Sequence, residues 1–230
     1  MTIKDTIRKY TNELKIVTHI PAKEVEILML HLLEKNTIWL HLNYNVEFEK
    51  EKELAVLVKK RATNYPLEYI INKASFYGEM FIVKEGVLIP RPETEILVEN
   101  AVEILKDIKQ PIKVLEIGTG SGIISVILAM LIENIKIIAV DINEKAIELA
   151  KQNAIKNGVE NKIEFRLSNL YENINKNDIF MTISNPPYIA NNYKLPTNVK
   201  YEPSNALFGG VVGDELLKDI IKGTNEKNIP

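Results

Sequence analysis

Residues 184–188, Ser-Asn-Pro-Pro-Tyr, can hold a planar nitrogen group. The nitrogen of an amide or exocyclic amine is a poor nucleophile because its lone pair is delocalised. Two acceptors, the Asn185 side-chain carbonyl and the Pro186 backbone carbonyl, can bind both N–H protons and orient the nitrogen toward a methyl group. Pro186 and Pro187 stiffen this loop, and Tyr188 offers an aromatic face to a planar substrate. Asn-Pro-Pro is also an ordinary turn, so the position of the segment in the fold decides between the two interpretations.

A second segment, residues 116–122, reads Glu-Ile-Gly-Thr-Gly-Ser-Gly. Glycines between a strand and a helix let the chain turn sharply and let a ligand approach the backbone, although a purely structural turn is the alternative. A dinucleotide-binding loop would have a third glycine at position 123, which is Ile123 here. The spacing resembles motif I of S-adenosylmethionine-binding methyltransferases. The residues expected to bind that cofactor are Glu116, Gly118, Thr119, Gly120, Ser121 and Gly122.

Asp141 ends the next predicted strand. A carboxylate at this place can accept hydrogen bonds from both hydroxyls of a ribose. The alternative is that Asp141 caps the following helix, but Asn143 is better placed as the N-cap residue. We therefore expect Asp141 to bind the cofactor ribose.

From residue 112 the pattern alternates between apolar strands and helices. The predicted strands are 114–117, 135–140, 162–167 and 179–184, and the predicted helices are 122–131 and 144–157. This order indicates a Rossmann-like, doubly wound α/β fold with a parallel sheet and helices on both faces. Ligands bind such sheets at the carboxyl ends of the strands. The glycine loop and Asn185 should then line the same crevice.

The first half of the chain has a different character. Residues 1–73 read as a small helical bundle, with helices after Pro21 and over 49–61. Residues 74–94 read as a β-hairpin linker with strands at 81–83 and 87–89, and a helix is predicted over 93–105. We expect a helical substrate-recognition domain over 1–73 and a methyltransferase domain over 95–230.

Composition excludes several classes of protein. The chain has 230 residues, no cysteine and a formal net charge of −2. Disulfides and thiolate metal sites are therefore excluded, and the three histidines have no ligand-like spacing, so no metal is expected. The absence of a basic excess argues against direct nucleic-acid binding. No apolar run reaches the roughly 20 residues of a membrane span, so no membrane partner is expected and the cytoplasm is the expected location.

Three separate stretches support a more specific resemblance. The segments are 76–78 with 87–95, which contains Pro90-Arg91-Pro92, then 185–188, and 201–203 with 206–210. Together they resemble the HemK/PrmC family, the peptide chain release factor glutamine methyltransferases, over nearly the whole chain. The proline-arginine segment is the most specific part, because Asn-Pro-Pro-Tyr is shared with nucleic-acid methyltransferases.

The resemblance implies a substrate and further site residues. The substrate would be the glutamine of the Gly-Gly-Gln motif of release factors, methylated at N5 with S-adenosylmethionine as methyl donor. The resemblance adds Asn169 and Leu170 to the cofactor site, beside Asn185. It implies that Asn185, Pro186, Pro187, Tyr188 and Arg91 bind the substrate, and that the helical domain grips the release factor. It also leads us to expect a further strand and a terminal hairpin beyond Pro230, so that these 230 residues would be a C-terminally incomplete form.

Other functions stay open at this point. The nearest alternative is an adenine or guanine amino-methyltransferase that uses the same Asn-Pro-Pro-Tyr chemistry. Another relative methylates a glutamine of a ribosomal protein, but its proline-arginine segment differs from 90–95. A third possibility is a protein that binds the cofactor without turnover.

Overall fold

The computed structural model describes residues 1–172, 174 and 179–225. Backbone contacts divide the chain into two compact units. The first comprises Met1–Asn72 with Pro196–Tyr201, and the second comprises Lys73–Leu195 with residues 202–230. No helix of the described part is long and apolar enough to cross a membrane.

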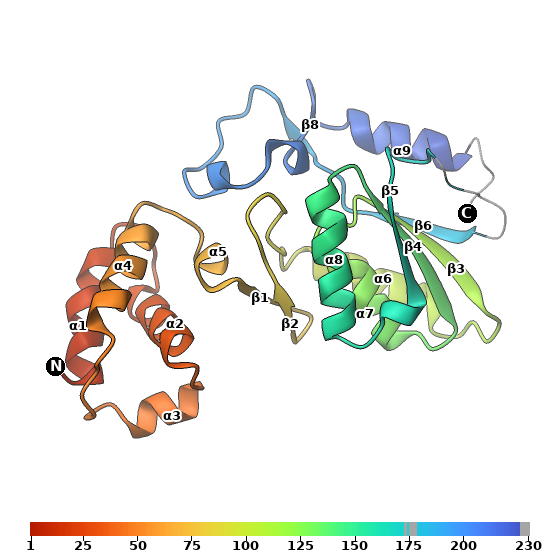
Figure 1. Cartoon of the computed structure of the whole chain (residues 1–230). Helices are drawn as coiled ribbons and strands as arrows, with labels where there is room; N and C mark the ends of the chain where they lie inside the picture. The colour runs from red at the N-terminus through yellow and green to blue at the C-terminus, as the bar shows by residue number, and fades with distance from the viewer. Residues whose placement is uncertain (173, 175–178, 226–230) are drawn as a thin grey trace. The chain divides into compact units, whose positions relative to one another are not determined.

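The first unit is helical, as predicted (Figure 1). Its helices are α1 (Ile3–Leu14), α2 (Pro21–Leu33), α3 (Thr37–Leu42), α4 (Glu51–Ala62) and α5 (Leu67–Ile71), with the short η2 (Val199–Tyr201). Pro21 occupies the first turn of α2, where its missing N–H costs no hydrogen bond. Leu14, Leu28 and Leu54 are fully buried between α1, α2 and α4.

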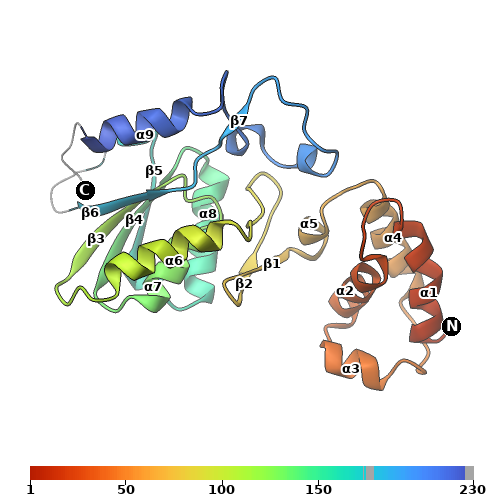
Figure 2. The same cartoon turned by 180° about the vertical axis from the view of Figure 1, so that it is seen from behind.

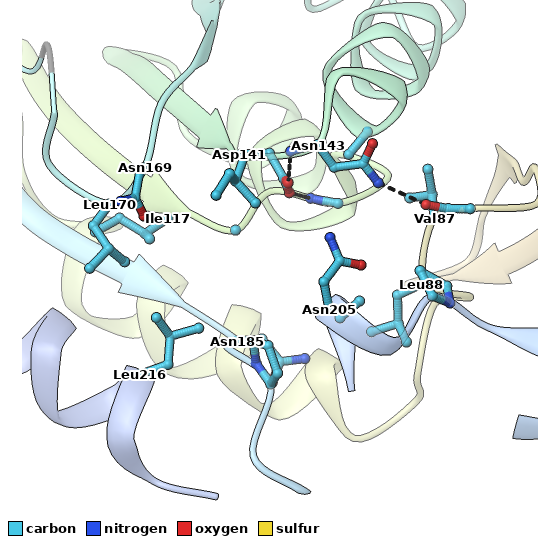
Figure 3. Close-up of a pocket in the computed structure, with 18 of the residues that line it drawn as sticks. Val87, Leu88, Ile117, Asp141, Asn143, Asn169, Leu170, Asn185, Asn205 and Leu216 are labelled. Carbon is cyan, nitrogen blue, oxygen red and sulfur yellow. Dashed lines mark hydrogen bonds between the residues drawn. The ribbon is translucent and has the colours of Figure 1, made fainter. Parts of the chain in front are cut away.

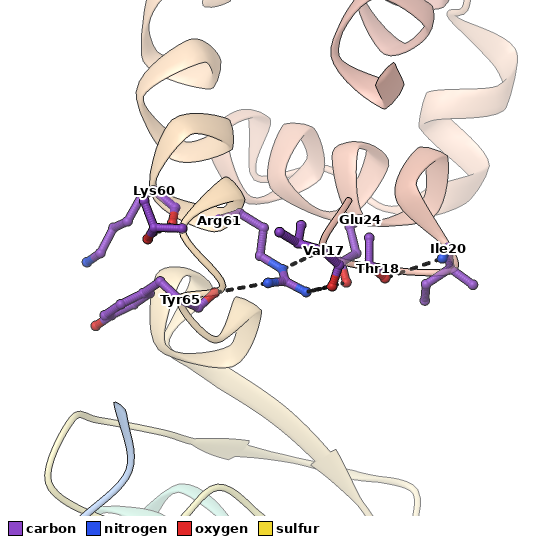
Figure 4. A network of polar contacts seen from close by, with 8 residues as sticks. Val17, Thr18, Ile20, Glu24, Lys60, Arg61 and Tyr65 are labelled. Carbon is purple, nitrogen blue, oxygen red and sulfur yellow. Dashed lines mark hydrogen bonds and ion pairs between the residues drawn. The ribbon is translucent and has the colours of Figure 1, made fainter. Parts of the chain in front are cut away.

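A buried ion pair ties α4 to α2 inside this unit (Figure 4). The Arg61 guanidinium donates to both carboxylate oxygens of Glu24, at 2.6 and 3.1 Å. It also donates to the backbone carbonyls of Val17 and Tyr65. Because both charged side chains are more than nine-tenths buried, each depends on the other for its compensation.

The second unit is built on a parallel sheet of four strands in the order β5-β4-β3-β6. The strands are β3 (Ile112–Ile117), β4 (Ile135–Asp141), β5 (Ile163–Leu167) and β6 (Ile179–Ser184). The predicted strands and the parallel α/β fold are confirmed. A parallel sheet is covered on both faces, so the side chains on both sides of its strands are buried. Densely apolar, β-branched runs such as 135–140 meet this requirement.

Helices cover one face of this sheet and one helix lies against the other (Figures 1 and 2). The first face packs against α6 (Thr94–Leu105), α7 (Ile123–Leu131) and α8 (Glu144–Lys156). The opposite face packs against α9 (Glu215–Asn225) and the segment around Tyr171. The short η1 (Glu160–Lys162) precedes β5.

A hairpin is present, and its second strand includes residues 81–82 of the predicted run 81–83, but the prediction of a partner strand at 87–89 was wrong. The hairpin is formed by β1 (Lys73–Phe76) and β2 (Glu79–Ile82), joined by Tyr77 and Gly78, which both have positive φ. Two such residues match a tight hairpin turn. The turn was missed because a tyrosine is an unusual residue for this backbone conformation. The segment 87–89 is not a strand, since the Ile89 N–H donates to the Glu202 carboxylate rather than to a neighbouring strand.

Another two-stranded sheet follows the Asn-Pro-Pro-Tyr segment. Its strands β7 (Ile189–Ala190) and β8 (Phe208–Gly210) are parallel, and η3 (Ser204–Ala206) precedes β8. This pairing fixes the chain after Tyr188 to the segment 208–210, which lies about 20 residues later.

Candidate functional site

The carboxyl ends of β3, β4 and β6 lie side by side. Ile117 at the end of β3 is paired with the last residue of β6 and with the penultimate residue of β4. Gly118, Asp141 and Asn185 therefore meet at one edge of the sheet. The chain order reverses direction between β3 and β6, which is the point where open α/β sheets bind ligands. The prediction that the glycine loop and Asn185 line one crevice is confirmed, because both line the same cavity.

This cavity has a volume of about 340 Å³. Figure 3 shows Asp141 and Asn143 on one side of it and Asn185 and Leu216 on the opposite side. Its apolar lining comes from several elements, namely Val87, Leu88, Ile117, Leu170, Phe208 and Leu216. Its polar lining consists mainly of amide side chains around one carboxylate, namely Asn143, Asn169, Asn185, Asn205 and Asp141. A mostly apolar cavity with a few polar groups is typical of a small-molecule site.

Gly118 and Gly120 leave room for a ligand over the backbone. Their φ angles are +73° and +55°, values that side chains disfavour. Among the described residues, no atom lies within 4 Å of the position that a Cβ would occupy at either glycine. These two glycines therefore present bare backbone to the cavity.

The Asp141 carboxylate binds the backbone of the glycine loop. Its Oδ2 accepts a hydrogen bond from the Gly120 N–H at 2.9 Å, and its Oδ1 accepts one from the Asn143 N–H at 2.8 Å. Burial raises the pKa of the Asp141 carboxyl above its usual value. The predicted N-cap is confirmed, because the Asn143 side chain accepts from the Lys145 N–H at 3.0 Å.

Asn143 also fixes a wall of the cavity. Its side-chain nitrogen donates to the Gly86 carbonyl at 2.8 Å, as the dashed line beside Val87 in Figure 3 shows. The loop of Gly86, Val87 and Leu88 is thereby held over the cavity that it lines. The sequence reasoning gave Asn143 only the role of a helix cap.

Glu116 lies beneath the loop rather than in the cavity lining. It is 1% exposed, and its Oε2 accepts from the Thr119 hydroxyl at 2.8 Å and from the Ser125 hydroxyl. Among the described residues, no group donates to Oε1. The pKa of the Glu116 carboxyl is raised to about 7, mainly because burial penalises the charged carboxylate. Its observed contacts support the loop from inside the protein.

The remaining loop residues, Thr119, Ser121 and Gly122, also lie outside the lining of the main cavity. Thr119 and Ser121 are buried and line a smaller hollow of about 40 Å³ beside it. Gly122 lines neither space, and a Cβ there would lie 2.9 Å from the Ala150 Cβ. The third glycine of the loop thus permits close contact with α8, whereas Gly118 and Gly120 face the ligand space.

Asn185 lies between the main cavity and a slot of about 40 Å³, and it lines both. The slot is also lined by Pro186 and Tyr188, together with the apolar side chains of Leu88, Ile189 and Leu207. Pro187 instead lines the main cavity. The Asn185 Nδ2 donates to the Thr94 Oγ1 at 3.0 Å, and no described residue donates to the Asn185 Oδ1. The side-chain carbonyl is therefore available as an acceptor.

Arg91 forms an ion pair rather than standing free in the slot. Its guanidinium donates to the Glu202 Oε1 at 2.5 Å, while the Glu202 Oε2 accepts from the Ile89 N–H at 3.1 Å. The Glu202 side chain is 2% exposed. One buried carboxylate thereby joins the proline-arginine segment to the chain after the Asn-Pro-Pro-Tyr segment, and Arg91 still contributes to the slot wall.

Gly209 and Gly213 allow the later part of the chain to pack closely against the Asn-Pro-Pro-Tyr segment. A Cβ at Gly209 would lie 2.3 Å from the Pro187 carbonyl oxygen, and one at Gly213 would lie 2.6 Å from the Tyr188 carbonyl oxygen. Only glycine permits such close approach. These contacts give a physical reason for glycine at Gly209, in the stretch 201–210 whose pattern was noted in the sequence.

The residues present fit S-adenosylmethionine. Bare backbone at Gly118 and Gly120 leaves room for the amino acid end, and the mostly buried Asp141 carboxylate can accept bonds from ribose hydroxyls. Leu170 and its neighbours provide an apolar wall for a planar base. The volume of 340 Å³ lies within the range of small-molecule cavities. Among the described residues, no group of three or more His, Cys, Asp or Glu side chains could hold a metal ion.

Thr94 and Glu202 are the residues that sequence reasoning missed in these roles. In the sequence, Thr94 is only one residue of the predicted helix 93–105, and Glu202 is only part of the stretch 201–210. Both act on residues roughly a hundred positions away, Asn185 and Arg91. No local pattern could have shown these pairs.

Comparison with known proteins gives the family. Residues 93–201 match the methyltransferase small domain, and residues 5–71 match the PrmC N-terminal domain. The chain is 42% identical to the release factor glutamine methyltransferase of Dictyoglomus turgidum, over 86% of this chain and 71% of the relative. The corresponding enzyme of Enterococcus faecalis is 40% identical, over 80% of this chain and 67% of the relative. The chain belongs to the release factor glutamine methyltransferase family.

A third relative shows how much of the family's length the chain represents. The release factor glutamine methyltransferase of Fusobacterium nucleatum is 38% identical, over 90% of this chain but 60% of the relative. The chain thus spans 60% to 71% of the length of these three relatives. The family assignment confirms the resemblance drawn from residues 76–78 with 87–95, 185–188, and 201–203 with 206–210.

Proposed function

We propose that this protein transfers a methyl group from S-adenosylmethionine to the side-chain amide nitrogen of the glutamine in the Gly-Gly-Gln motif of peptide chain release factors. The observation that carries the proposal is the place of Asn185, which lines both the 340 Å³ cavity and the adjoining slot. An amide in the slot would lie beside a ligand in the cavity. The names of the relatives supply the substrate class.

The chemistry of the protein side is orientation of a weak nucleophile. The Asn185 and Pro186 carbonyls accept the two N–H protons of the substrate amide, which points its nitrogen lone pair along one direction and favours positive charge on it. S-adenosylmethionine, when bound, would supply the methyl group from its sulfonium and leave as a neutral thioether, and the methylated nitrogen would release one proton to water. Gly118, Gly120, Asp141, Asn169 and Leu170 would hold that cofactor.

The slot also bears on the kind of acceptor. Its volume of about 40 Å³, between Leu88, Ile189 and Leu207, suits a carboxamide group better than a fused purine ring. Tyr188 also lines the slot and is 71% exposed. Its ring offers an aromatic face to a planar group that enters the slot. The net charge of −2 gives no general attraction for a phosphate backbone. These features favour a protein glutamine over a nucleobase.

The decisive experiment supplies methyl-labelled S-adenosylmethionine with either a release factor or RNA and locates the label by mass spectrometry. Label on the Gly-Gly-Gln glutamine is the expected result, and it should disappear when that glutamine is replaced by alanine. Label on RNA alone would refute the proposal in favour of a nucleic-acid methyltransferase. Cofactor binding without labelling of any substrate would point to a protein without turnover.

The Asn185→Ala variant tests the nucleophile site directly. Loss of one acceptor should lower the transfer rate on the order of a hundredfold or more, with cofactor affinity largely kept. Asn192→Ala, a change at an exposed asparagine a few residues later, is the matched control and should transfer at the wild-type rate. Near wild-type turnover of Asn185→Ala would remove Asn185 from the mechanism.

A further inference from the structure

Thr94 is a buried polar residue at the start of α6 whose hydroxyl faces the Asn-Pro-Pro-Tyr segment. It is 5% exposed, and its backbone N–H donates to the Arg91 carbonyl at 3.0 Å. Its Oγ1 accepts the hydrogen bond from the Asn185 Nδ2 at 3.0 Å. Thr94 and Asn185 also line the same hollow beside the glycine loop.

The direction of this hydrogen bond matters because an asparagine amide has two unlike ends. Its terminal torsion is broad and roughly two-fold, so rotation by 180° exchanges the carbonyl oxygen and the NH₂ group at little intrinsic cost. With the oxygen outward, Asn185 can accept from a substrate N–H. With the NH₂ outward, it would place donors against the donors of a substrate amide. A hydroxyl can either donate or accept, but the bond observed here runs from the Asn185 Nδ2 to the Thr94 Oγ1, which favours the first orientation.

We propose that Thr94 is a positioning residue for the methyl-acceptor site: by accepting from the Asn185 Nδ2, its hydroxyl turns the Asn185 carbonyl toward the substrate amide. The inference rests on the proposed function, since it concerns how that function orients its acceptor. Thr94 itself need not touch the substrate.

The surrounding contacts keep Thr94 in place. The segment before it is held by the Arg91–Glu202 ion pair, and the Glu95 side chain after it accepts from the Tyr77 N–H at 2.7 Å. On the other side, the Ser184 hydroxyl donates to the Ile117 carbonyl at 2.7 Å and so fixes the end of β6. Both partners of the Thr94–Asn185 bond are therefore attached to rigid elements, which is what precise orientation requires.

The first test compares Thr94→Val with Thr94→Ser in methyl transfer to a release factor. Valine keeps the shape and removes the acceptor, so kcat should fall about 10- to 100-fold, while the KM for release factor and the Kd for S-adenosylmethionine change less than about threefold. Serine keeps the hydroxyl and should restore kcat to within about threefold of wild type. This rescue separates orientation from packing.

Thr6→Val is the matched control for the loss of a buried threonine hydroxyl. Thr6 is fully buried in α1, and its hydroxyl donates to the Thr2 carbonyl at 2.8 Å, far along the chain from Asn185. This variant should lose thermal stability to a similar degree as Thr94→Val without loss of kcat. Equal kcat losses in Thr94→Val and Thr94→Ser, or wild-type kcat in Thr94→Val, would overturn the assignment of Thr94.

A second readout does not depend on turnover. In ¹⁵N-labelled protein, the Asn185 side-chain NH₂ signals are identified by their disappearance in Asn185→Ala. Thr94→Val should shift these signals and speed their exchange with water, whereas Thr94→Ser should keep them near the wild-type positions. Unchanged signals in Thr94→Val would overturn the proposal. If the wild-type protein labels no release factor, the proposed function fails and the assignment fails with it, whereas an active wild type with an unaffected Thr94→Val refutes Thr94 alone.

Discussion

The two carboxylates beside the glycine loop serve different neighbours. Asp141 lines the cavity and holds the backbone N–H groups of Gly120 and Asn143 with its two oxygens. Glu116 lies out of the cavity, where it binds the hydroxyls of Thr119 and Ser125. A substitution at Asp141 should therefore change the affinity for the ligand, whereas a substitution at Glu116 should change the free energy of unfolding.

Asp141→Ala should weaken S-adenosylmethionine binding about 10- to 100-fold, because it removes a charge-assisted acceptor for ribose and frees the Gly120 N–H. Isothermal titration calorimetry gives the affinity directly. Asp107→Ala, at an exposed aspartate, is the control and should bind as the wild type does. Unchanged affinity in Asp141→Ala would refute the placement of the ribose.

Glu116 should make stability depend on pH. Its folded-state pKa of about 7 lies above the ordinary 4.5, so the folded protein binds this proton more tightly than the unfolded chain does. The free energy of unfolding should therefore fall as pH rises from about 4.5 to about 7, by on the order of 3 kcal/mol from this group. Above pH 7 the carboxylate is ionised in both states and the loss is complete.

Glu116→Gln tests this dependence, because a neutral amide can still accept from Thr119 and Ser125. Urea unfolding at pH 5, 6, 7 and 8 should show a flatter profile than the wild type and greater stability above pH 7. Glu160→Gln, at an exposed glutamate, should leave the profile unchanged. Parallel profiles for Glu116→Gln and wild type would show that Glu116 does not titrate in this range.

Site residues could be predicted from the sequence where each one follows a strand. Asn185, Asp141 and the glycines lie at strand ends, and the parallel order brings strand ends together without further information. Thr94 and Glu202 could not be predicted in this way. Thr94 lies 91 positions from Asn185 and Glu202 lies 111 positions from Arg91, so their roles exist only after the segments have packed.

At the scale of helices and strands, apolar periodicity predicted most of the second unit. Strand 179–184 has the predicted bounds, and helix α8 differs from its predicted range by one residue at its end. Periodicity failed for the hairpin, where the turn consists of Tyr77 and Gly78 and the segment 87–89 bonds to a side chain instead of a strand. Short apolar runs do not reveal which backbone groups will pair across a sheet.

Packing of α8 against the glycine loop gives a prediction at this scale. Gly122→Ala would place a methyl group 2.9 Å from the Ala150 Cβ and 3.0 Å from its Cα, at a φ of +80°. The backbone strain should cost about 1–2 kcal/mol, and the forced displacement of α8 should cost about 1–3 kcal/mol more. Chemical denaturation measures the loss.

Gly158→Ala separates the two terms. Gly158 has a φ of +69°, and no described atom lies within 4 Å of the position of its Cβ, so this variant should show the strain alone. Gly122→Ala should therefore be the less stable of the two. Equal losses would mean that the contact with Ala150 relaxes without cost.

For the whole molecule, the division into two compact units implies that each has its own core. Every described residue that lines the cavity and the slot belongs to the second unit. We propose that the first unit binds the release factor, as the family resemblance implies. A loss of stability in the first unit should then raise the KM for the release factor and leave the affinity for S-adenosylmethionine unchanged.

The buried Glu24–Arg61 pair offers a way to test this separation. Arg61→Met would leave the Glu24 carboxylate buried without its cation, which should cost the first unit about 3–5 kcal/mol. Hydrogen exchange followed by mass spectrometry should show faster exchange over Met1–Asn72 and unchanged protection of the four-stranded sheet. The KM for release factor should rise while the affinity for S-adenosylmethionine stays at the wild-type value.

The double variant Glu24→Leu/Arg61→Met is the control for this last prediction. Replacing both buried charges by apolar side chains removes the unpaired carboxylate, so most of the lost stability should return, together with slow exchange in the first unit and the wild-type KM. A single variant that also speeds exchange in the strands β3 and β6, or weakens cofactor binding, would show that the two units unfold together. In that event the buried pair would stabilise the cofactor site as well as the helical bundle.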